Sequence, residues 1–298
     1  MPELEALKRQ IDSVQDLQSI VKTMKALAAV SIRQYEKAVA SLAEYNRTLE
    51  MGVQILLQRC PEVLMGLQAT APTGLGIVVF GSDQGMCGAF NDRIAQFLLD
   101  QLQQQSLPPE CQKLLAVGTR VRDGLEAAGH RVESSFAIPG SIGAIAPMVQ
   151  DIVLTLETWR QQRAIDQILV FHNQPISSAS YQPRQQQLFP LSLDWLRSQQ
   201  QRPWPNRCLP NFTQSPDRLM ASLFRQYFFV SLYRACAASL ASENASRLAS
   251  MQIAEKNIAE RRAELQTEFN HQRQTAITEE LLDIVSGFEA LTQAKSGS

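Results

Sequence analysis

Two long stretches of this sequence contain neither glycine nor proline, the residues that interrupt helices most often. They run from Glu3 to Met51 and from Asp217 to Ser286. At about 1.5 Å per residue, continuous helices over these stretches would be roughly 73 Å and 105 Å long. Helices of globular proteins average about three turns. The sequence therefore predicts two very long helices at its two ends, with a compact segment between them.

Paired cysteines are also absent, although the chain contains five cysteines. None belongs to a Cys-x-x-Cys motif, and none combines with His130, His172 or His271 in a zinc-binding spacing. We therefore expect buried, reduced thiols, no metal site and no bound cofactor.

The chain lacks an excess of charge of either sign, because its 28 basic residues nearly balance its 29 acidic residues. This balance provides no general attraction toward nucleic acid or lipid. The chain also lacks an apolar run of the roughly 20 residues that cross a bilayer, since Arg225 and Arg234 interrupt its most apolar stretch. The N-terminus has no apolar core of a secretory signal. We expect a soluble chain without a nucleic-acid partner, which could still serve a membrane machine from outside.

Apolar residues repeat every seven positions in the N-terminal stretch. One column is apolar throughout, whereas Gln18, Lys25 and Asn46 interrupt the other. The columns are Leu7, Val14, Val21, Ala28, Tyr35, Leu42, Leu49 and Leu56, and Leu4, Ile11, Gln18, Lys25, Ile32, Val39, Asn46 and Val53. A repeat of this kind is typical of a left-handed coiled coil. The alternative is one long helix packed on a globular core.

The C-terminal stretch begins after Ser215 and Pro216, a plausible capping residue and a residue suited to the first helical turn. Its apolar stripe is less regular, and its surface between Glu255 and Glu268 is heavily charged. Because the two stretches lie at opposite ends of the chain, they can pair as an antiparallel coiled coil. The C-terminal stretch is the longer one, so its tip should project beyond its partner.

The middle of the chain alternates short apolar runs with segments of helical spacing. The apolar runs lie at 76–80, 113–118 and 165–171, and the helical segments lie at 90–105, 120–128 and 145–160. This alternation predicts an α/β fold class, with a central Rossmann-like domain around a parallel or mixed sheet. Residues 199–210, which are rich in proline and glutamine, are expected to form an exposed connection. The expected domains are residues 1–58, 74–195 and 212–294.

A glycine-rich turn at Gly81–Gly88 follows the first expected strand, at the place where α/β folds often bind phosphate. It lacks the Gly-Lys-Ser/Thr ending of a P-loop and the Gly-x-Gly-x-x-Gly spacing. We therefore prefer a tight strand-to-helix turn, and the alternative is a nucleotide-binding α/β enzyme with helical dimerisation arms. Cys87 opens the next helix, where a thiol can become reactive, but no histidine or basic residue stands near it. We expect Cys87 to be structural.

Several segments resemble the γ subunit of F-type ATP synthases. The most specific is C-terminal, where Glu243-Asn244-Ala245-Ser246-Arg247-Leu248 is followed by Arg273-Gln274-Thr275-Ala276-Ile277-Thr278-Glu279-Glu280. The run Ser82-Asp83-x-Gly85-x-Cys87-Gly88 resembles the central motif of the family, and Ile11-Asp12-Ser13-Val14 with Met24 resembles its N-terminal helix. The resemblance extends over nearly the whole chain, in order.

The chain departs from the family at several positions. Gln84 and Gln252 stand where a basic residue is usual, and Val30-Ser31 replaces the usual Ser-Lys. Met86 and Ala89 also differ from the usual leucine and glycine. These departures suggest a divergent member of the family, from an alternate or sodium-type ATPase.

The resemblance implies a non-catalytic rotor subunit of a proton- or sodium-translocating F-type ATPase. Such a central stalk couples ion flow through the membrane ring to ATP synthesis or hydrolysis in the catalytic hexamer. The implied partners are the α and β subunits of the hexamer, the ε subunit and the c-ring of the membrane sector. The implied location is the cytoplasmic face of the bacterial plasma membrane, as a peripheral subunit. No catalytic residue is expected in this chain.

The resemblance also implies partner contacts at particular residues. Arg273, Gln274 and Thr278 match positions that engage a loop of one catalytic subunit. Met24 and Arg247 match positions where the shaft meets the surrounding hexamer. The positions that match an apolar bearing for the shaft tip are Ile284, Val285, Phe288 and Leu291.

Overall fold

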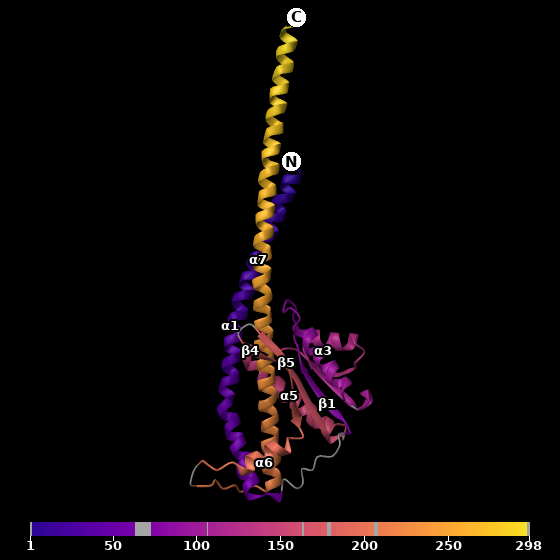
Figure 1. Ribbon diagram of the computed structural model, residues 1–298, viewed down its shortest axis with the longest axis vertical. Helices are drawn as coiled ribbons and strands as arrows, with labels where there is room; N and C mark the ends of the chain where they lie inside the picture. The colour runs from indigo at the N-terminus through magenta and orange to yellow at the C-terminus, as the bar shows by residue number, and fades with distance from the viewer. Residues whose placement is uncertain are drawn as a thin grey trace. The chain divides into compact units, whose positions relative to one another are not determined.

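The computed structural model describes residues 2–62, 73–105, 107–162, 164–177, 180–205 and 208–296, and within these ranges the side chains of residues 4–176 and 180–286. The chain divides into two compact units. The first unit combines Met1–Leu27 with Ala249–Ser298, and the second comprises Ala28–Leu248. Each unit is a body with its own internal contacts (Figure 1).

Two very long helices form the ends of the chain, as the scarcity of glycine and proline predicted. Helix α1 spans Pro2–Arg59, and helix α7 spans Pro216–Ser296. The first backbone bond of α7 runs from the amide of Leu219 to the carbonyl of Ser215, at 3.0 Å. This helix therefore begins at the predicted proline.

In the first unit, α1 and α7 pack side by side in opposite directions (Figure 1). The ammonium of Lys25 lies 2.5 Å from the carboxylate of Glu255, and Arg262 donates a hydrogen bond to Gln18 at 3.4 Å. Seven residues back along α1 correspond to seven residues forward along α7, so the pair is antiparallel. The two polar residues that interrupt the apolar column thus find partners across the helix pair. In the same register, the start of α1 lies beside the part of α7 near Ala276.

The second unit is built around a mixed sheet. Within the described residues its strand order is β3-β2-β1-β4-β5. Strands β1, β2 and β4 run parallel, as does β3 beside β2, and β5 returns antiparallel to β4. The strands span Leu75–Phe80 (β1), Gln112–Val117 (β2), Val132–Phe136 (β3), Gln167–Ser177 (β4) and Ser180–Phe189 (β5). The α/β class with a Rossmann-like domain is confirmed.

Helices cover both faces of this sheet. Helices α3 (Phe90–Gln103) and α4 (Thr119–Ala127) pack on the face that carries Ile77 and Val79. Helix α5 (Ile142–Gln161) and the buried part of α7 pack on the face that carries Val78 and Phe80. Strand β1 is therefore buried on both faces, which is why its sequence is continuously apolar rather than alternating.

Three elements have weak sequence signals. Strands β3 and β5 lie at the two edges of the sheet and expose alternate polar side chains, so they contain no apolar run. Helix α6 (Leu193–Gln201) enters the segment that was expected to be an exposed connection, and this expectation was wrong for residues 199–201. Leu196 is fully buried against the end of α1, and the Ser192 hydroxyl accepts the amide of Trp195 at the start of the helix.

Replacing Leu57 tests how much the buried end of α1 contributes to the stability of the second unit. Its side chain is fully buried beside Leu196 and Met220, whereas the side chain of Leu27 is 63% exposed. Leu57→Ala should lower the free energy of unfolding by about 2–5 kcal/mol, because the change leaves a cavity. Leu27→Ala in the isolated chain should change it by less than about 0.5 kcal/mol.

Denaturant unfolding followed by tryptophan fluorescence is the measurement, because Trp159, Trp195 and Trp204 all lie in the second unit. Equal effects of the two substitutions would contradict the packing described for the end of α1.

Candidate functional site

The last described turns of α7 carry an apolar surface that nothing in the described part of the chain covers. Its side chains are between 46% and 68% exposed: Ile277, Leu281, Leu282, Ile284 and Val285. Ile277, Leu281, Ile284 and Val285 follow the spacing of one helix face. All of these residues except Ile277 lie beyond the start of α1 in the helix register, so α1 does not shield them. A continuous exposed apolar surface of this kind marks a site where another molecule packs.

The structure places Ile284 and Val285 on this surface, as the resemblance implied. The side chains of Phe288 and Leu291 lie outside the described residues. Contact of these four residues with a partner stays a prediction.

A polar cluster precedes the apolar surface. Arg273, Gln274 and Thr278 are all exposed, and the hydroxyl of Thr278 donates a hydrogen bond to the carbonyl of Gln274 at 2.9 Å. No acidic group forms an ion pair with Arg273 within the described part of the chain. Its guanidinium can therefore offer a charge and several donors to a partner.

A second exposed apolar stripe lies on α1 in the first unit. Leu17, Ile20 and Leu27 are 52–63% exposed, and the half-buried Met24 lies between them in the same spacing of three and four residues. Of these four residues the family resemblance indicated only Met24, and the heptad columns that face α7 dominate the sequence pattern. A search for a second repeat, displaced from those columns, could have found the other three residues.

Arg247 differs from the other predicted contact residues because it is buried. Its guanidinium donates a hydrogen bond to the carboxylate of Glu243 at 2.6 Å, and the side chains of Arg247 and Glu243 are only 11% and 6% exposed. Burial raises the pKa of Glu243, while the charge of Arg247 and its hydrogen bond lower it. The structure therefore uses Arg247 inside the chain, and a contact with a partner stays a prediction.

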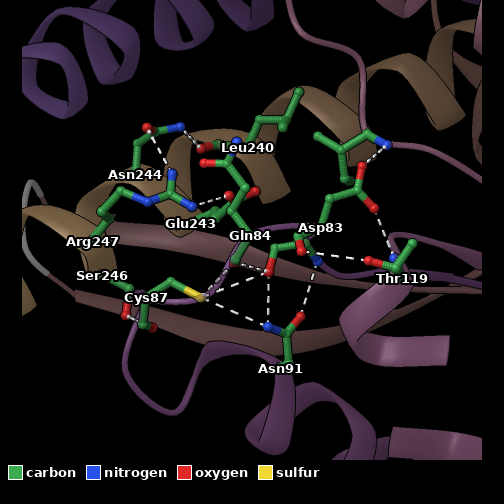
Figure 2. A network of polar contacts seen from close by, with 12 residues as sticks. Asp83, Gln84, Cys87, Asn91, Thr119, Leu240, Glu243, Asn244, Ser246 and Arg247 are labelled. Atoms are coloured by element: carbon green, nitrogen blue, oxygen red, sulfur yellow. Dashed lines mark hydrogen bonds and ion pairs between the residues drawn. The ribbon is translucent and has the colours of Figure 1, made fainter. Parts of the chain in front are cut away.

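The turn after β1 is attached to α7 close to this ion pair (Figure 2). The hydroxyl of Ser246 donates a hydrogen bond to the carbonyl of Cys87 at 2.5 Å. Within the turn, Asn91 binds both the amide and the hydroxyl of Ser82, at 2.9 and 2.8 Å. This network holds the glycine-rich turn in one conformation against the helix.

Asp83, in the turn after β1, binds backbone amides at the start of the neighbouring helix α4 and after β3. One carboxylate oxygen accepts the amide of Thr119, the first residue of α4, at 2.8 Å, and the other accepts the amide of Ile138 at 2.7 Å (Figure 2 shows the contact with Thr119). A carboxylate at a helix N-terminus satisfies its free amides and repels a second anion. The start of α4 is therefore already occupied by a negatively charged group of the chain itself.

Met86, which lies within this turn, has an unusual backbone conformation. Its φ of 60° lies in the left-handed region, and its side chain is 65% exposed. A non-glycine residue in this region is uncommon and strained. The turn thus presents an apolar side chain to the solvent, which composition and spacing did not indicate.

Two further kinds of feature are absent from the described residues: a metal-holding cluster and a membrane-spanning helix. No group of three or more His, Cys, Asp or Glu side chains that could hold a metal occurs among the described residues. In that same part of the chain, no helix is long and apolar enough to cross a membrane. The surfaces of this chain suit packing against other molecules.

Comparison with known proteins yields one consistent family. The family model described as ATP synthase matches residues 3–291. The ATP synthase gamma chain of Heliobacterium modesticaldum is 28% identical over 297 residues, which is 98% of this chain and 100% of that protein. The gamma chain of Moorella thermoacetica is 27% identical over 296 residues, with the same coverage.

Solved structures share the fold. The central stalk and c-ring structure of Tetrahymena thermophila mitochondrial ATP synthase contains a chain with a TM-score of 0.59 and 24% identity, covering 79% of this chain and 99% of that one. A rotor chain of Euglena gracilis mitochondrial ATP synthase has a TM-score of 0.63 and 16% identity, covering 93% and 99%. A second structure from Euglena gracilis, with the c-ring, has a TM-score of 0.67 and 17% identity, covering 99% and 96%.

The environment of Cys87 predicts a thiol of low reactivity. The residue is 1% exposed, and burial raises the pKa of its thiol, although the hydrogen bond with Ser82 partly opposes this effect. Cys208 is exposed and serves as an internal control. In the native chain, alkylation by iodoacetamide should be slower at Cys87 than at Cys208 by more than about a hundredfold, because the thiolate is the reactive form.

Peptide mapping by mass spectrometry at successive times measures both rates in one sample. In denaturant the two rates should converge. Rapid native alkylation of Cys87 would show that the turn is open and that the thiol has a chemical role.

Proposed function

Since this chain belongs to the ATP synthase γ-subunit family, we propose that it is the central-stalk rotor of an F-type ATPase. The observation that carries this proposal is the match of the family model over residues 3–291. The antiparallel pair of long helices and the uncovered apolar tip of α7 support it. A rotor needs both a stiff element and a surface that can turn within a partner.

In this role the chain couples ion flow through the membrane ring to ATP synthesis or hydrolysis in the catalytic hexamer. The partners are the α and β subunits of the hexamer, the ε subunit and the c-ring. Rotation of an asymmetric shaft changes which catalytic subunit it contacts and how. The contacts stabilise different conformations of the catalytic subunits in turn, which changes their nucleotide affinity. The chain itself supplies no catalytic residue.

The proposed parts of the rotor follow the expected domains. Residues 1–58 and 212–294 form the shaft, and residues 74–195 form the foot. Lys25–Glu255 and Gln18–Arg262 cross-connect the shaft helices, which resists sliding of one helix along the other. The exposed stripe of Leu17, Ile20, Met24 and Leu27 then faces the hexamer rather than α7.

The proposed contacts with the hexamer lie on α7. Arg273, Gln274 and Thr278 engage a loop of one catalytic subunit, and a small polar cluster suits a contact that breaks and reforms during rotation. Ile284, Val285, Phe288 and Leu291 turn in an apolar bearing. Arg247 stiffens α7 through Glu243 and reaches the hexamer only by its exposed edge.

The finer assignment concerns the ion, the type of complex and its location. We assign the chain to a proton- or sodium-translocating complex, as a divergent member of the family from an alternate or sodium-type ATPase. Neutral residues at positions that are usually basic, such as Gln84 and Gln252, support this assignment. The similar gamma chains of two bacteria support a place at the cytoplasmic face of a bacterial plasma membrane.

Arg273→Leu should impair coupling far more than folding. The arginine is exposed and without an ion-pair partner in the described chain, so the isolated chain should lose less than about 0.5 kcal/mol of stability. In the complex the substitution removes a charge-assisted contact of about 1.5–3 kcal/mol. We expect altered ATP hydrolysis and ATP-driven ion pumping in complexes that contain the variant chain.

Arg261→Leu is the matched control, because Arg261 already pairs with Glu264 on its own helix. Assembly is checked for both variants by size-exclusion chromatography. If assembled Arg273→Leu complexes hydrolyse ATP and pump like the wild type, this polar contact does not exist in this chain. An ATPase activity that does not depend on this chain at all would instead indicate a passive scaffold, and tight nucleotide binding by the isolated chain would favour the α/β enzyme.

A further inference from the structure

A polar cavity in the second unit has no part in the proposed function. Its volume is about 200 Å³, and α1, α7, α6 and the hairpin of β4 and β5 contribute to its lining. The residues that matter here are His172 and Gln174 on β4, Arg184 on β5, Arg234 on α7 and Glu50 on α1. All of them belong to one compact unit.

His172 is a buried, ionisable member of this lining. It is 4% exposed, and its Nδ1 has no hydrogen-bond partner among the described residues. A buried polar nitrogen without a partner costs stability, so natural proteins rarely leave one unsatisfied. The cavity beside the ring provides space for a molecule that supplies the missing partner.

The electrostatic environment shows what kind of molecule would be favoured. Burial, Arg184 and Arg234 lower the pKa of His172 to about 4, so the ring is neutral at pH 7. Burial, the largest of these causes, disfavours a charge of either sign, whereas the positive potential of Arg184 and Arg234 favours an anion beside the ring. The neutral ring still carries one N–H, which can donate a hydrogen bond to that anion.

The two arginines are available for such a ligand. Arg184 donates to the neutral side-chain oxygen of Gln174 at 2.5 Å, and Arg234 has no hydrogen bond or ion pair within the described part of the chain. Glu50 opposes them with one negative charge, and its carboxylate accepts a hydrogen bond from Asn46 at 2.7 Å. The charged side chains of the lining therefore sum to one positive charge.

We propose that this cavity binds a phosphate-sized oxoanion, with Arg184 and Arg234 as its cationic ligands and His172 as the donor at its floor. Arginine suits this task, because its planar fork of donors matches the oxygens of phosphate. Sites for larger ligands usually measure about 300–1,000 Å³, so this smaller cavity suits an inorganic anion better than a nucleotide. A bound anion would connect β4, β5 and α7 and would stabilise the packing of α7 against the sheet.

The test measures thermal unfolding and calorimetric binding of the full chain in potassium phosphate, against potassium chloride of equal ionic strength. Phosphate should raise the unfolding temperature with saturation, because a ligand of the folded state stabilises it. Arg234→Gln should weaken phosphate binding by about ten- to a hundredfold, since it removes a charge-assisted hydrogen bond. Sulfate should compete with phosphate, and ADP and ATP should bind more weakly than phosphate.

Arg225→Gln is the control for loss of an arginine from the same helix. Arg225 lies outside this cavity and pairs with Glu157 at 2.8 Å, so its replacement should leave the phosphate affinity unchanged. Three results would each overturn the proposal: no saturable effect of phosphate beyond that of chloride, equal phosphate affinity in Arg234→Gln and wild type, or tighter binding of ADP or ATP than of phosphate. Because the isolated chain is measured, these results do not depend on its role as a rotor.

Discussion

Residues 228–241 of α7 pack in the same core as β1, β2 and β4, and the same helix continues without a break to residue 296. Leu232, Cys236 and Leu240 are nearly or completely buried there. The packing of this helix segment against the sheet is the interaction on which the rest of the structure depends. Because the helix is continuous, a force applied to the sheet acts on the same covalent element that carries the exposed tip. A rotor can transmit torque only if this joint does not slip.

Polar side chains at buried or half-buried positions determine which residues of neighbouring elements lie opposite each other. Gln18 and Lys25 weaken the apolar column of α1, yet each pairs with one residue of α7. Purely apolar seams tolerate sliding by a heptad, whereas a polar pair is satisfied in only one register. The bond from Ser246 to Cys87 acts in the same way between α7 and the turn after β1, close to the buried pair of Glu243 and Arg247 within α7. Such groups contribute to specificity more than to stability.

The surfaces that the described chain leaves uncovered are exposed faces of helices. The α/β domain keeps a glycine-rich strand-to-helix turn, without the residues of a nucleotide-binding motif. Asp83 binds the first amide of α4 and so connects the turn after β1 to the neighbouring strand-to-helix connection. Function then depends on which side chains remain uncovered: the tip of α7, the polar cluster at Arg273 and the second stripe of α1. Each is an exposed surface available for packing against another molecule, which fits a subunit whose partners perform the chemistry.

The sequence by itself determined the two long helices, their antiparallel pairing, the strands β1, β2 and β4 and the family. These follow from local rules, such as the absence of glycine and proline, the heptad spacing and apolar runs buried on both faces. It did not reveal β3, β5 and α6, because edge strands and a short helix bury few residues and carry weak patterns. The tertiary structure alone decided that Arg247 is buried, that Lys25 meets Glu255 and that His172 lies beside two arginines. Residues far apart in sequence create these environments, and no local pattern encodes the distances between them.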